Sequence, residues 1–81
     1  MKLYETIEMM NSTDFKERFK AEYYQLSIRL DGLLAMLAKW ENGILDFTPK
    51  CSKVILEKQV GFMQGYKKIL ELRAEIEEID L

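Results

Sequence analysis

The sequence predicts an all-α protein, in which a short amino-terminal helix precedes an antiparallel hairpin of two long helices. Apolar residues recur at helical spacing over 14–41 and 51–79, and the only proline, Pro49, falls between these segments. The chain has 81 residues, of which 48% are hydrophobic. A chain of this length forms one domain (1–81) and buries only about 60% of its unfolded surface. Two-sided apolar helices cannot be hidden in so small a fold, so we expect a homo-oligomer, a dimer or higher.

The first ten residues predict a short helix or an extension. Leu3, Ile7 and Met10 stand at helical spacing over 1–10, although a helix this short needs support from the rest of the fold. A run of N-cap residues then breaks the pattern. Asp14 and Glu17 have the spacing of a capping box, which predicts the start of the first long helix.

The segment 14–41 carries one strong apolar stripe and one weak patch. We expect the stripe to form the core, with Phe15 and Leu34 widening it; it consists of Phe19, Tyr23, Leu26, Leu30, Leu33, Leu37 and Trp40. On the opposite side lie Tyr24, Ile28 and Ala35. That patch is either a subunit contact or a solvated face, and we favour the contact, with Ile28 at an oligomer interface.

A loop over 42–50 separates the two long helices. Asn42 and Gly43 tolerate the left-handed conformation that ends a helix, and Pro49 cannot continue one. The last helix then begins at Cys51 or Ser52, either of which can cap it, and runs to about Ile79. Its final turns are acidic, which opposes the helix macrodipole, so fraying is expected there unless a partner supplies positive charge.

The last helix shows three parallel lanes of residues spaced seven apart. The lanes are Ile55, Phe62, Ile69 and Ile76; Gln59, Tyr66 and Arg73; and Leu56, Met63 and Leu70. The polar lane therefore lies within the apolar face, where its members are either buried and paired or in contact with a ligand. Gly61, Gly65 and Leu72 share the back of the helix. Because glycine weakens a helix by roughly 0.5–1 kcal/mol, these three positions predict an oligomer interface at which another backbone approaches.

The composition argues against catalysis. The chain has no histidine and a single cysteine, so the commonest general base and metal ligand are missing, and we expect no enzyme, no cofactor and no metal. Cys51 is expected to be a small buried or capping residue. A net charge of −2 disfavours binding of long nucleic acid. With no signal segment or membrane span, we expect a cytoplasmic protein without membrane partners.

Binding of a ligand is the class of function that remains, and the side chains suit a small nucleotide. Aromatic rings stack on bases, cations hold phosphates and amides read base edges. The candidate ligand-binding residues are Lys20, Tyr23, Tyr24, Arg29, Gln59, Tyr66 and Arg73. The structural alternative makes Tyr66 a core aromatic with its hydroxyl at the rim, and pairs Arg73 with Glu22 or another acid across the hairpin.

Two resemblances add to this reading. The run DFKERFKAEYYQL, the segment from Phe47 to Cys51 with Pro49, and the ending ILELRAEIE resemble the crAss-like-phage related family of small proteins, over about residues 10–81. The helical plan and the stretch VGFM (60–63) are similar to the phage anti-CBASS sponge proteins, helical hexamers that sequester cyclic oligonucleotides. This second resemblance implies a hexamer whose ligand contacts are a tyrosine and a lysine from the amino-terminal half and an arginine from the last helix. On side-chain chemistry we assign these contacts to Tyr23, Lys20 and Arg73.

The sequence therefore supports two hypotheses. The first is a phage-encoded anti-defence sponge that binds a nucleotide immune second messenger between subunits without cleaving it. The alternative is a non-enzymatic helical module that inhibits or adapts a host or phage protein through its exposed apolar faces.

Overall fold

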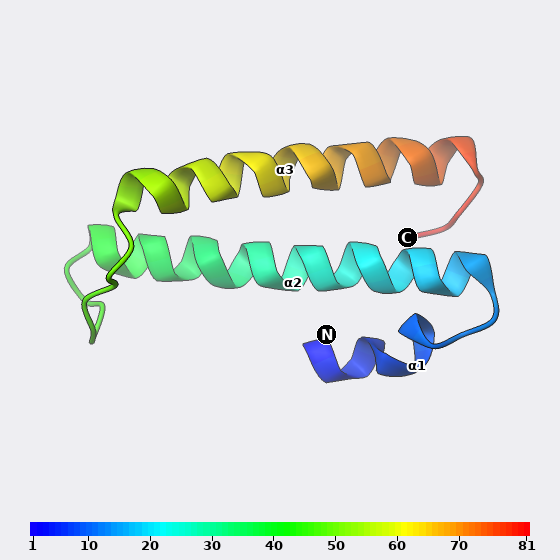
Figure 1. Cartoon of the computed structure of the whole chain (residues 1–81), viewed down its shortest axis with the longest axis horizontal. Coiled ribbons are helices and arrows are strands. Elements are labelled where there is room, and N and C mark those ends of the chain that lie inside the picture. The colour runs from blue at the N-terminus through cyan, green and yellow to red at the C-terminus, as the bar shows by residue number, and fades with distance from the viewer.

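The computed structural model describes residues 1–81 and contains only helices. A 3-10 helix η1 (Leu3–Thr6) leads into α1 (Ile7–Met10), followed by α2 (Phe15–Glu41) and α3 (Lys53–Ile76). Figure 1 shows α2 in the middle, with α3 running antiparallel along one side of it and the η1/α1 segment on the other. The all-α prediction is confirmed. The molecule is flat and elongated, with extents of 43 × 24 × 17 Å.

The core lies between α2 and α3, toward the end of the hairpin where α2 begins and α3 ends. Its buried cluster consists of Phe19, Leu26, Leu70, Ala74 and Ile79, with Tyr23 and Met63 packed against it. Every member of the α2 stripe is buried or half-buried, as predicted. The prediction that Phe15 and Leu34 widen this stripe is wrong, because they remain 44% and 39% exposed.

The amino-terminal segment packs on the opposite side of α2, and its one buried residue is polar. Thr6 is only 1% exposed, and its hydroxyl donates to the Leu3 carbonyl at 2.7 Å and accepts from Gln25 Nε2 at 2.9 Å. Leu3, Ile7 and Met10, whose spacing predicted this helix, are each at least 37% exposed. The first turn is a 3-10 helix, a form frequent where a short helix begins.

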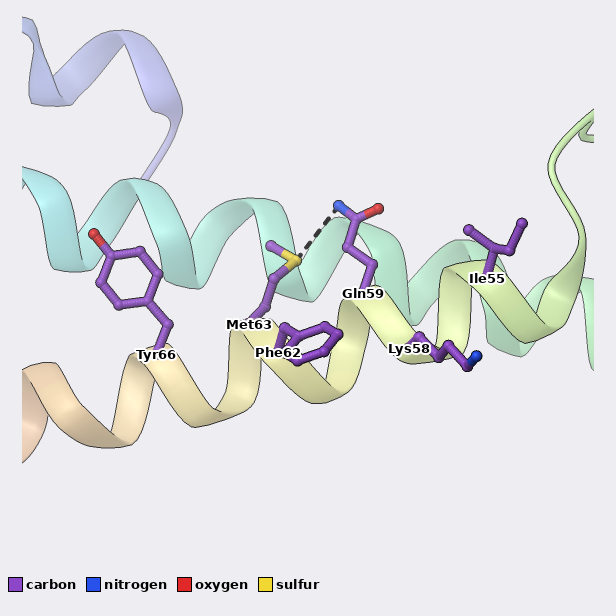
Figure 2. Close-up of a pocket in the computed structure, with 6 residues that line it drawn as sticks. All are labelled: Ile55, Lys58, Gln59, Phe62, Met63 and Tyr66. Atoms are coloured by element: carbon purple, nitrogen blue, oxygen red, sulfur yellow. Dashed lines mark hydrogen bonds between the residues drawn. The ribbon is translucent and has the colours of Figure 1, made fainter.

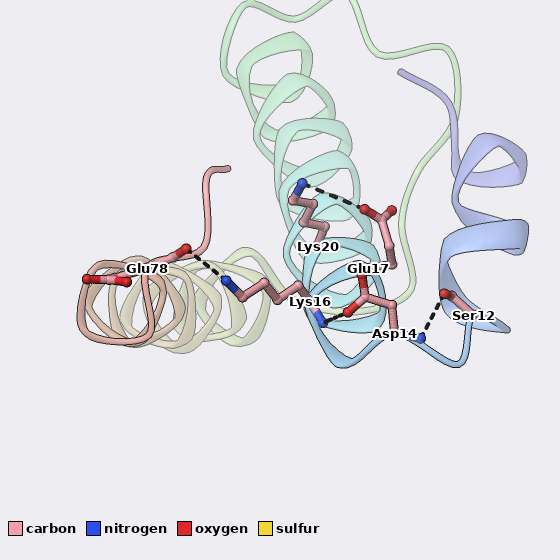
Figure 3. A network of polar contacts seen from close by, with 6 residues as sticks. All are labelled: Ser12, Asp14, Lys16, Glu17, Lys20 and Glu78. Carbon is pink, nitrogen blue, oxygen red and sulfur yellow. Dashed lines mark hydrogen bonds and ion pairs between the residues drawn. The ribbon is translucent and has the colours of Figure 1, made fainter.

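The start of α2 differs from the predicted capping box. Asp14 is the N-cap, and its carboxylate accepts from the Lys16 amide at 3.0 Å. Glu17 does not complete the box, because the Asp14 amide instead donates to Ser12 Oγ at 3.0 Å. Glu17 pairs with Lys20 Nζ at 3.7 Å, as Figure 3 shows.

The start of α3 corrects two expectations about Cys51. Ser52 is the N-cap, and its hydroxyl accepts from the Ile55 amide at 3.3 Å, so α3 begins at Lys53 and not at Cys51. Cys51 is therefore not the cap, and it is not buried, because its side chain is exposed. Beside it, Lys53 pairs with Glu41 at 3.6 Å and lies 4.9 Å from the Trp40 ring centroid, which ties the two helices together at this end.

Both long helices end in the same left-handed turn. After α2, Gly43 has φ +69°, and the Ile44 amide donates to the Lys39 carbonyl at 3.0 Å. After α3, Glu78 has φ +56°, and the Ile79 amide donates to the Ala74 carbonyl at 2.8 Å. This is the Schellman pattern.

The Schellman turn stops α3 at Ile76, three residues before the predicted end at Ile79, and folds the chain back. Ile79 is only 6% exposed and belongs to the core. The Lys16 ammonium donates to the Glu78 carbonyl at 3.4 Å (Figure 3). The acidic end is therefore closed by a buried isoleucine, and Lys16 of α2 supplies the positive charge without which fraying was expected.

Candidate functional site

The three lanes of α3 occupy three different environments. Leu70 is fully buried against α2, and Met63 and Leu56 in the same lane are half-buried. The other apolar lane faces solvent and is 55–79% exposed; it consists of Ile55, Phe62, Ile69 and Ile76. The polar lane lies between these two, along the edge of the hairpin. Its members are exposed, which places them within reach of a ligand.

The polar lane and the exposed lane together line a shallow hollow on α3. The hollow has a volume of about 400 Å³ and is lined by Ile55, Lys58, Gln59, Phe62, Met63 and Tyr66. Figure 2 shows their side chains in order along one helix, α3. The hollow therefore combines two aromatic rings, an aliphatic wall, an amide and an ammonium group, with only one helix beneath it.

The polar lane makes few contacts inside the chain. The Tyr66 hydroxyl donates to the Glu22 carboxylate across the hairpin, while the residue as a whole stays 45% exposed. The Gln59 amide nitrogen donates only to the Met63 sulfur, at 3.7 Å (Figure 2). The Gln59 carbonyl oxygen and part of the Tyr66 ring therefore remain open to a ligand.

Arg73 is the third member of the lane. Its guanidinium lies 5.0 Å from the Phe19 ring centroid and 3.8 Å from the Glu77 carboxylate. The structural alternative paired Arg73 with Glu22 or another acid across the hairpin. In the structure Glu22 accepts from Tyr66, and the acid beside Arg73 is Glu77 of its own helix. With a side chain that is 48% exposed, Arg73 keeps donor capacity for another anion, because guanidinium offers five N–H groups.

The seven candidate residues fall on two edges of the hairpin. We call the first the Tyr66 edge; it carries Gln59, Tyr66, Arg73 and, from α2, Arg29. Arg29 follows Glu22 by seven residues and shares its face, so in the antiparallel hairpin it lies across from Gln59, seven residues before Tyr66. Arg29 is exposed and makes no ion pair within the chain.

We call the opposite side the Tyr23 edge, and it carries Lys20, Tyr23 and Tyr24. The Tyr23 hydroxyl donates to Glu71 at 2.7 Å, and the ring packs edge-on against Tyr24 with centroids 5.8 Å apart. The hydrogen bond to Glu71, with desolvation, raises the pKa of Tyr23. Lys67 also lies 5.7 Å from the centroid of the Tyr23 ring. Both the hydroxyl and the ring of Tyr23 therefore contact side chains of α3 within the same chain.

Sequence reasoning missed three contributors to these edges. Lys58 lines the hollow. It lies one helical turn before Phe62, so the sequence already indicates that the two share a face. Glu71 and Lys67 engage Tyr23 from the facing helix. No sequence pattern links those residues to Tyr23, because they come together only through the register of α2 against α3.

The residues predicted to form an interface stand on two helices. A Cβ added at Gly61 or Gly65 would meet no atom within 4 Å, and Leu72 beside them is 52% exposed. Ile28 lies on the far side of α2 and is half-buried. Within one chain nothing approaches the two glycines, so the fold of the monomer does not require glycine at either position.

Two further findings concern metals and membranes. No three acidic, cysteine or histidine side chains lie close enough together to hold a metal ion. None of the helices combines the length and the apolar character needed to cross a membrane.

The fold and the site define a small helical hairpin with an exposed, ligand-sized hollow and an uncovered apolar face. The chain belongs to the Sequestin family, whose model matches residues 13–76. The match covers α2, the loop and α3, and leaves out η1 and α1. The family name suggests sequestration of a partner, and thus binding instead of catalysis. No curated protein and no solved structure matches the chain.

Proposed function

We propose that this protein is a phage-encoded anti-defence sponge that sequesters a nucleotide immune second messenger, a cyclic oligonucleotide or a related signal, without cleaving it. The observation that carries the proposal is the hollow on α3, where Phe62 and Tyr66 flank Gln59 and Lys58. Its volume of about 400 Å³ falls in the range of small-molecule pockets. The sponge reading also agrees with a family whose name suggests sequestration.

Each part of a nucleotide finds matching chemistry on the Tyr66 edge. A base can stack on the exposed rings of Phe62 or Tyr66, and the free carbonyl oxygen of Gln59 can accept from an amino group of the base. Lys58 and Arg73 supply charge-assisted hydrogen bonds to phosphates. No group on this edge is placed as a nucleophile with a base beside it, so the expected outcome of binding is storage of an intact ligand.

The hollow is open on one side, which bears on the assembly. Small-molecule sites bury about 70–90% of a ligand's surface, whereas here only one helix supports it. We therefore propose that the functional unit is a homo-oligomer, in which further subunits cover the ligand. The uncovered apolar lane beside the hollow, with Phe62 79% exposed, supports this assembly.

Titration calorimetry tests the proposal directly. The protein is titrated with cyclic di-AMP, cyclic di-GMP, cyclic tri-AMP and ADP-ribose, and the bound nucleotide is recovered by denaturation and examined by chromatography. We expect saturable binding of at least one probe and recovery of the intact compound. Absence of heat with every probe, or recovery of a cleaved product, refutes the sponge.

Arg73 offers a sharp variant with a matched control. Arg73→Glu reverses one charge on the Tyr66 edge, so we expect loss of nucleotide binding with the oligomer size retained. Glu77→Gln removes the acid that Arg73 pairs with at 3.8 Å and should leave binding equal or tighter, because the guanidinium is then released. Equal binding by Arg73→Glu and the native protein contradicts the assignment of this edge.

A second candidate is a protein-binding module, which the exposed lane of α3 favours. Apolar residues at seven-residue intervals are the pattern by which a helix lies in a groove of a partner. Protein capture that persists in Arg73→Glu, together with no heat from the nucleotides, would favour this function over the sponge.

A further inference from the structure

We propose that α3 pairs antiparallel with α3 of a second copy about an axis beside Gly65 and Tyr66, so that the partner's Arg73 completes the nucleotide hollow. This inference deepens the proposed function and rests on it for the identity of the ligand. The pairing itself stands on separate observations, namely the area, the charges and the glycines of α3.

The exposed face of α3 is large enough to hold two copies together. Six apolar side chains on one side of the helix are each more than half exposed: Val54, Ile55, Phe62, Ile69, Leu72 and Ile76. Together they leave uncovered on the order of 700 Å², close to the ~800 Å² that each partner contributes to a standard interface. An apolar patch of this size on a soluble domain marks an interaction surface.

The charges on α3 favour a second copy in the antiparallel direction. The start of the helix and the residues just before it are basic, with Lys50, Lys53 and Lys58 against Glu57. The final turns and the residues after them are acidic, with Glu71, Glu75, Glu77, Glu78 and Asp80 against Arg73. Both ends oppose the macrodipole of their own helix. In an antiparallel pair each basic end meets an acidic end, and the two helix dipoles point in opposite directions, which is the favourable arrangement. A parallel pair would bring like charges together.

The spacing of the exposed lane fixes the register. When the two-fold axis passes between Gly65 and Tyr66, Ile55 faces the partner's Ile76 and Phe62 faces the partner's Ile69. The middle of the seam then falls at Gly65, where a Cβ would meet nothing within 4 Å inside the chain. A glycine at that point permits close approach of the two helices, which accounts for a residue that costs a helix roughly 1 kcal/mol relative to alanine.

The same symmetry brings the partner's arginine to the hollow. A two-fold axis perpendicular to two antiparallel helices keeps the polar lanes of both copies on the same flank of the seam. Arg73 of one copy then stands at the level of Lys58 and Gln59 of the other. Phe62 then packs within the seam, so the ring left for base stacking is that of Tyr66. Each dimer therefore holds two composite sites, each with Gln59 and Tyr66 from one chain and Arg73 from its partner. A parallel pair would put the polar lanes on opposite flanks and leave both hollows open.

Cysteine cross-linking tests the direction and the register without any ligand. Two variants are made in a Cys51→Ser background: Ile55→Cys and Ile76→Cys, both at positions that are more than half exposed. These positions lie about 32 Å apart along one helix at 1.5 Å per residue. Under oxidation we expect little disulfide dimer from either variant alone and a dimer from their mixture, in up to about half of the chains. Dimers formed by Ile55→Cys alone, or no dimer from the mixture, overturn the antiparallel seam.

A second pair of variants tests the composite site. Gln59→Cys and Arg73→Cys, in the same background, are mixed and treated with a short bismaleimide. We expect cross-linked dimers from the mixture, because the two positions meet across the seam on one flank. Lys68→Cys, on the other flank, is the control partner for Gln59→Cys and should give at least fivefold less product. Equal products from the two mixtures refute the placement of the partner's Arg73.

These outcomes separate the seam from the sponge. Cross-links in the stated pattern with no heat from the nucleotide titrations leave the seam standing and remove the proposed ligand. Nucleotide binding without those cross-links keeps the sponge and removes the composite site.

Discussion

Glu78 offers a prediction in which the structure fixes both the sign and the size of a stability change. It is the only non-glycine residue with a positive φ, at +56°, and it holds the place that Gly43 holds after α2. The left-handed conformation costs an L-residue about 1–2 kcal/mol, while glycine loses about 0.5–1 kcal/mol more backbone entropy on folding. Relief of backbone strain in Glu78→Gly should therefore raise the free energy of unfolding by about 0.5–1 kcal/mol.

Charge adds to this effect and must be separated from it. Removing an acid from a helix C-terminus contributes about 0.3–1 kcal/mol through the macrodipole. Glu78→Gln removes the charge and keeps a side chain in the left-handed turn, whereas Glu78→Asn places there a residue that tolerates it. The contact from Lys16 reaches the backbone carbonyl of Glu78, so all three variants retain that acceptor.

Thermal unfolding followed by circular dichroism measures the series at one protein concentration, because self-association shifts the midpoint. We expect stability to rise in the order native, Glu78→Gln, Glu78→Asn, Glu78→Gly. A gain of about 1 kcal/mol corresponds to roughly 4–8 °C in a domain of this size. If Glu78→Gly is no more stable than Glu78→Gln, the strain argument is wrong and only the charge matters.

Three further predictions concern the core, the Tyr23 edge and the composite site. Leu70→Ala empties a fully buried position and should cost about 3 kcal/mol in urea unfolding, whereas Leu34→Ala, at a position 39% exposed, should cost less than half of that. The pKa of Tyr23 is raised in the folded state, so its hydrogen bond to Glu71 stabilises the fold below the unfolded pKa of about 10. This stabilisation is lost as the pH rises through the folded pKa. Between pH 8 and 11 the free energy of unfolding should therefore fall more in the native protein than in Tyr23→Phe. Tyr66→Ala and Arg73→Gln should each fail to bind nucleotide alone, while their mixture should recover about a quarter of the native capacity, because each mixed dimer keeps one intact site; no recovery would place both residues in one chain's site.

The sequence predicted which candidate residues share a face within one helix, but not which edge of the hairpin each group occupies. The spacing of the polar lane put Gln59, Tyr66 and Arg73 on one face, and the structure keeps them on one edge, where Gln59 and Tyr66 line the hollow. Side-chain chemistry added Lys20, Tyr23 and Tyr24 to the same candidate set. It did not separate that group from the polar lane, because the side of α3 on which α2 residues fall depends on the rotation of one helix against the other.

The sequence by itself determined the helical class, the position of the loop and the residues that share each face, because helical periodicity and turn residues are local properties of the chain. It did not determine which face of α3 is buried. The lanes led by Ile55 and Leu56 are almost equally apolar, and only packing against α2 buried Leu70 and left Phe62 79% exposed. It also placed the end of α3 too late, because the stop at Ile76 depends on Ile79 reaching a core formed by residues distant in the sequence. Those outcomes follow from tertiary contacts, in which the free energy of burial selects one of two similar faces and a buried side chain stabilises a turn that its own residues disfavour.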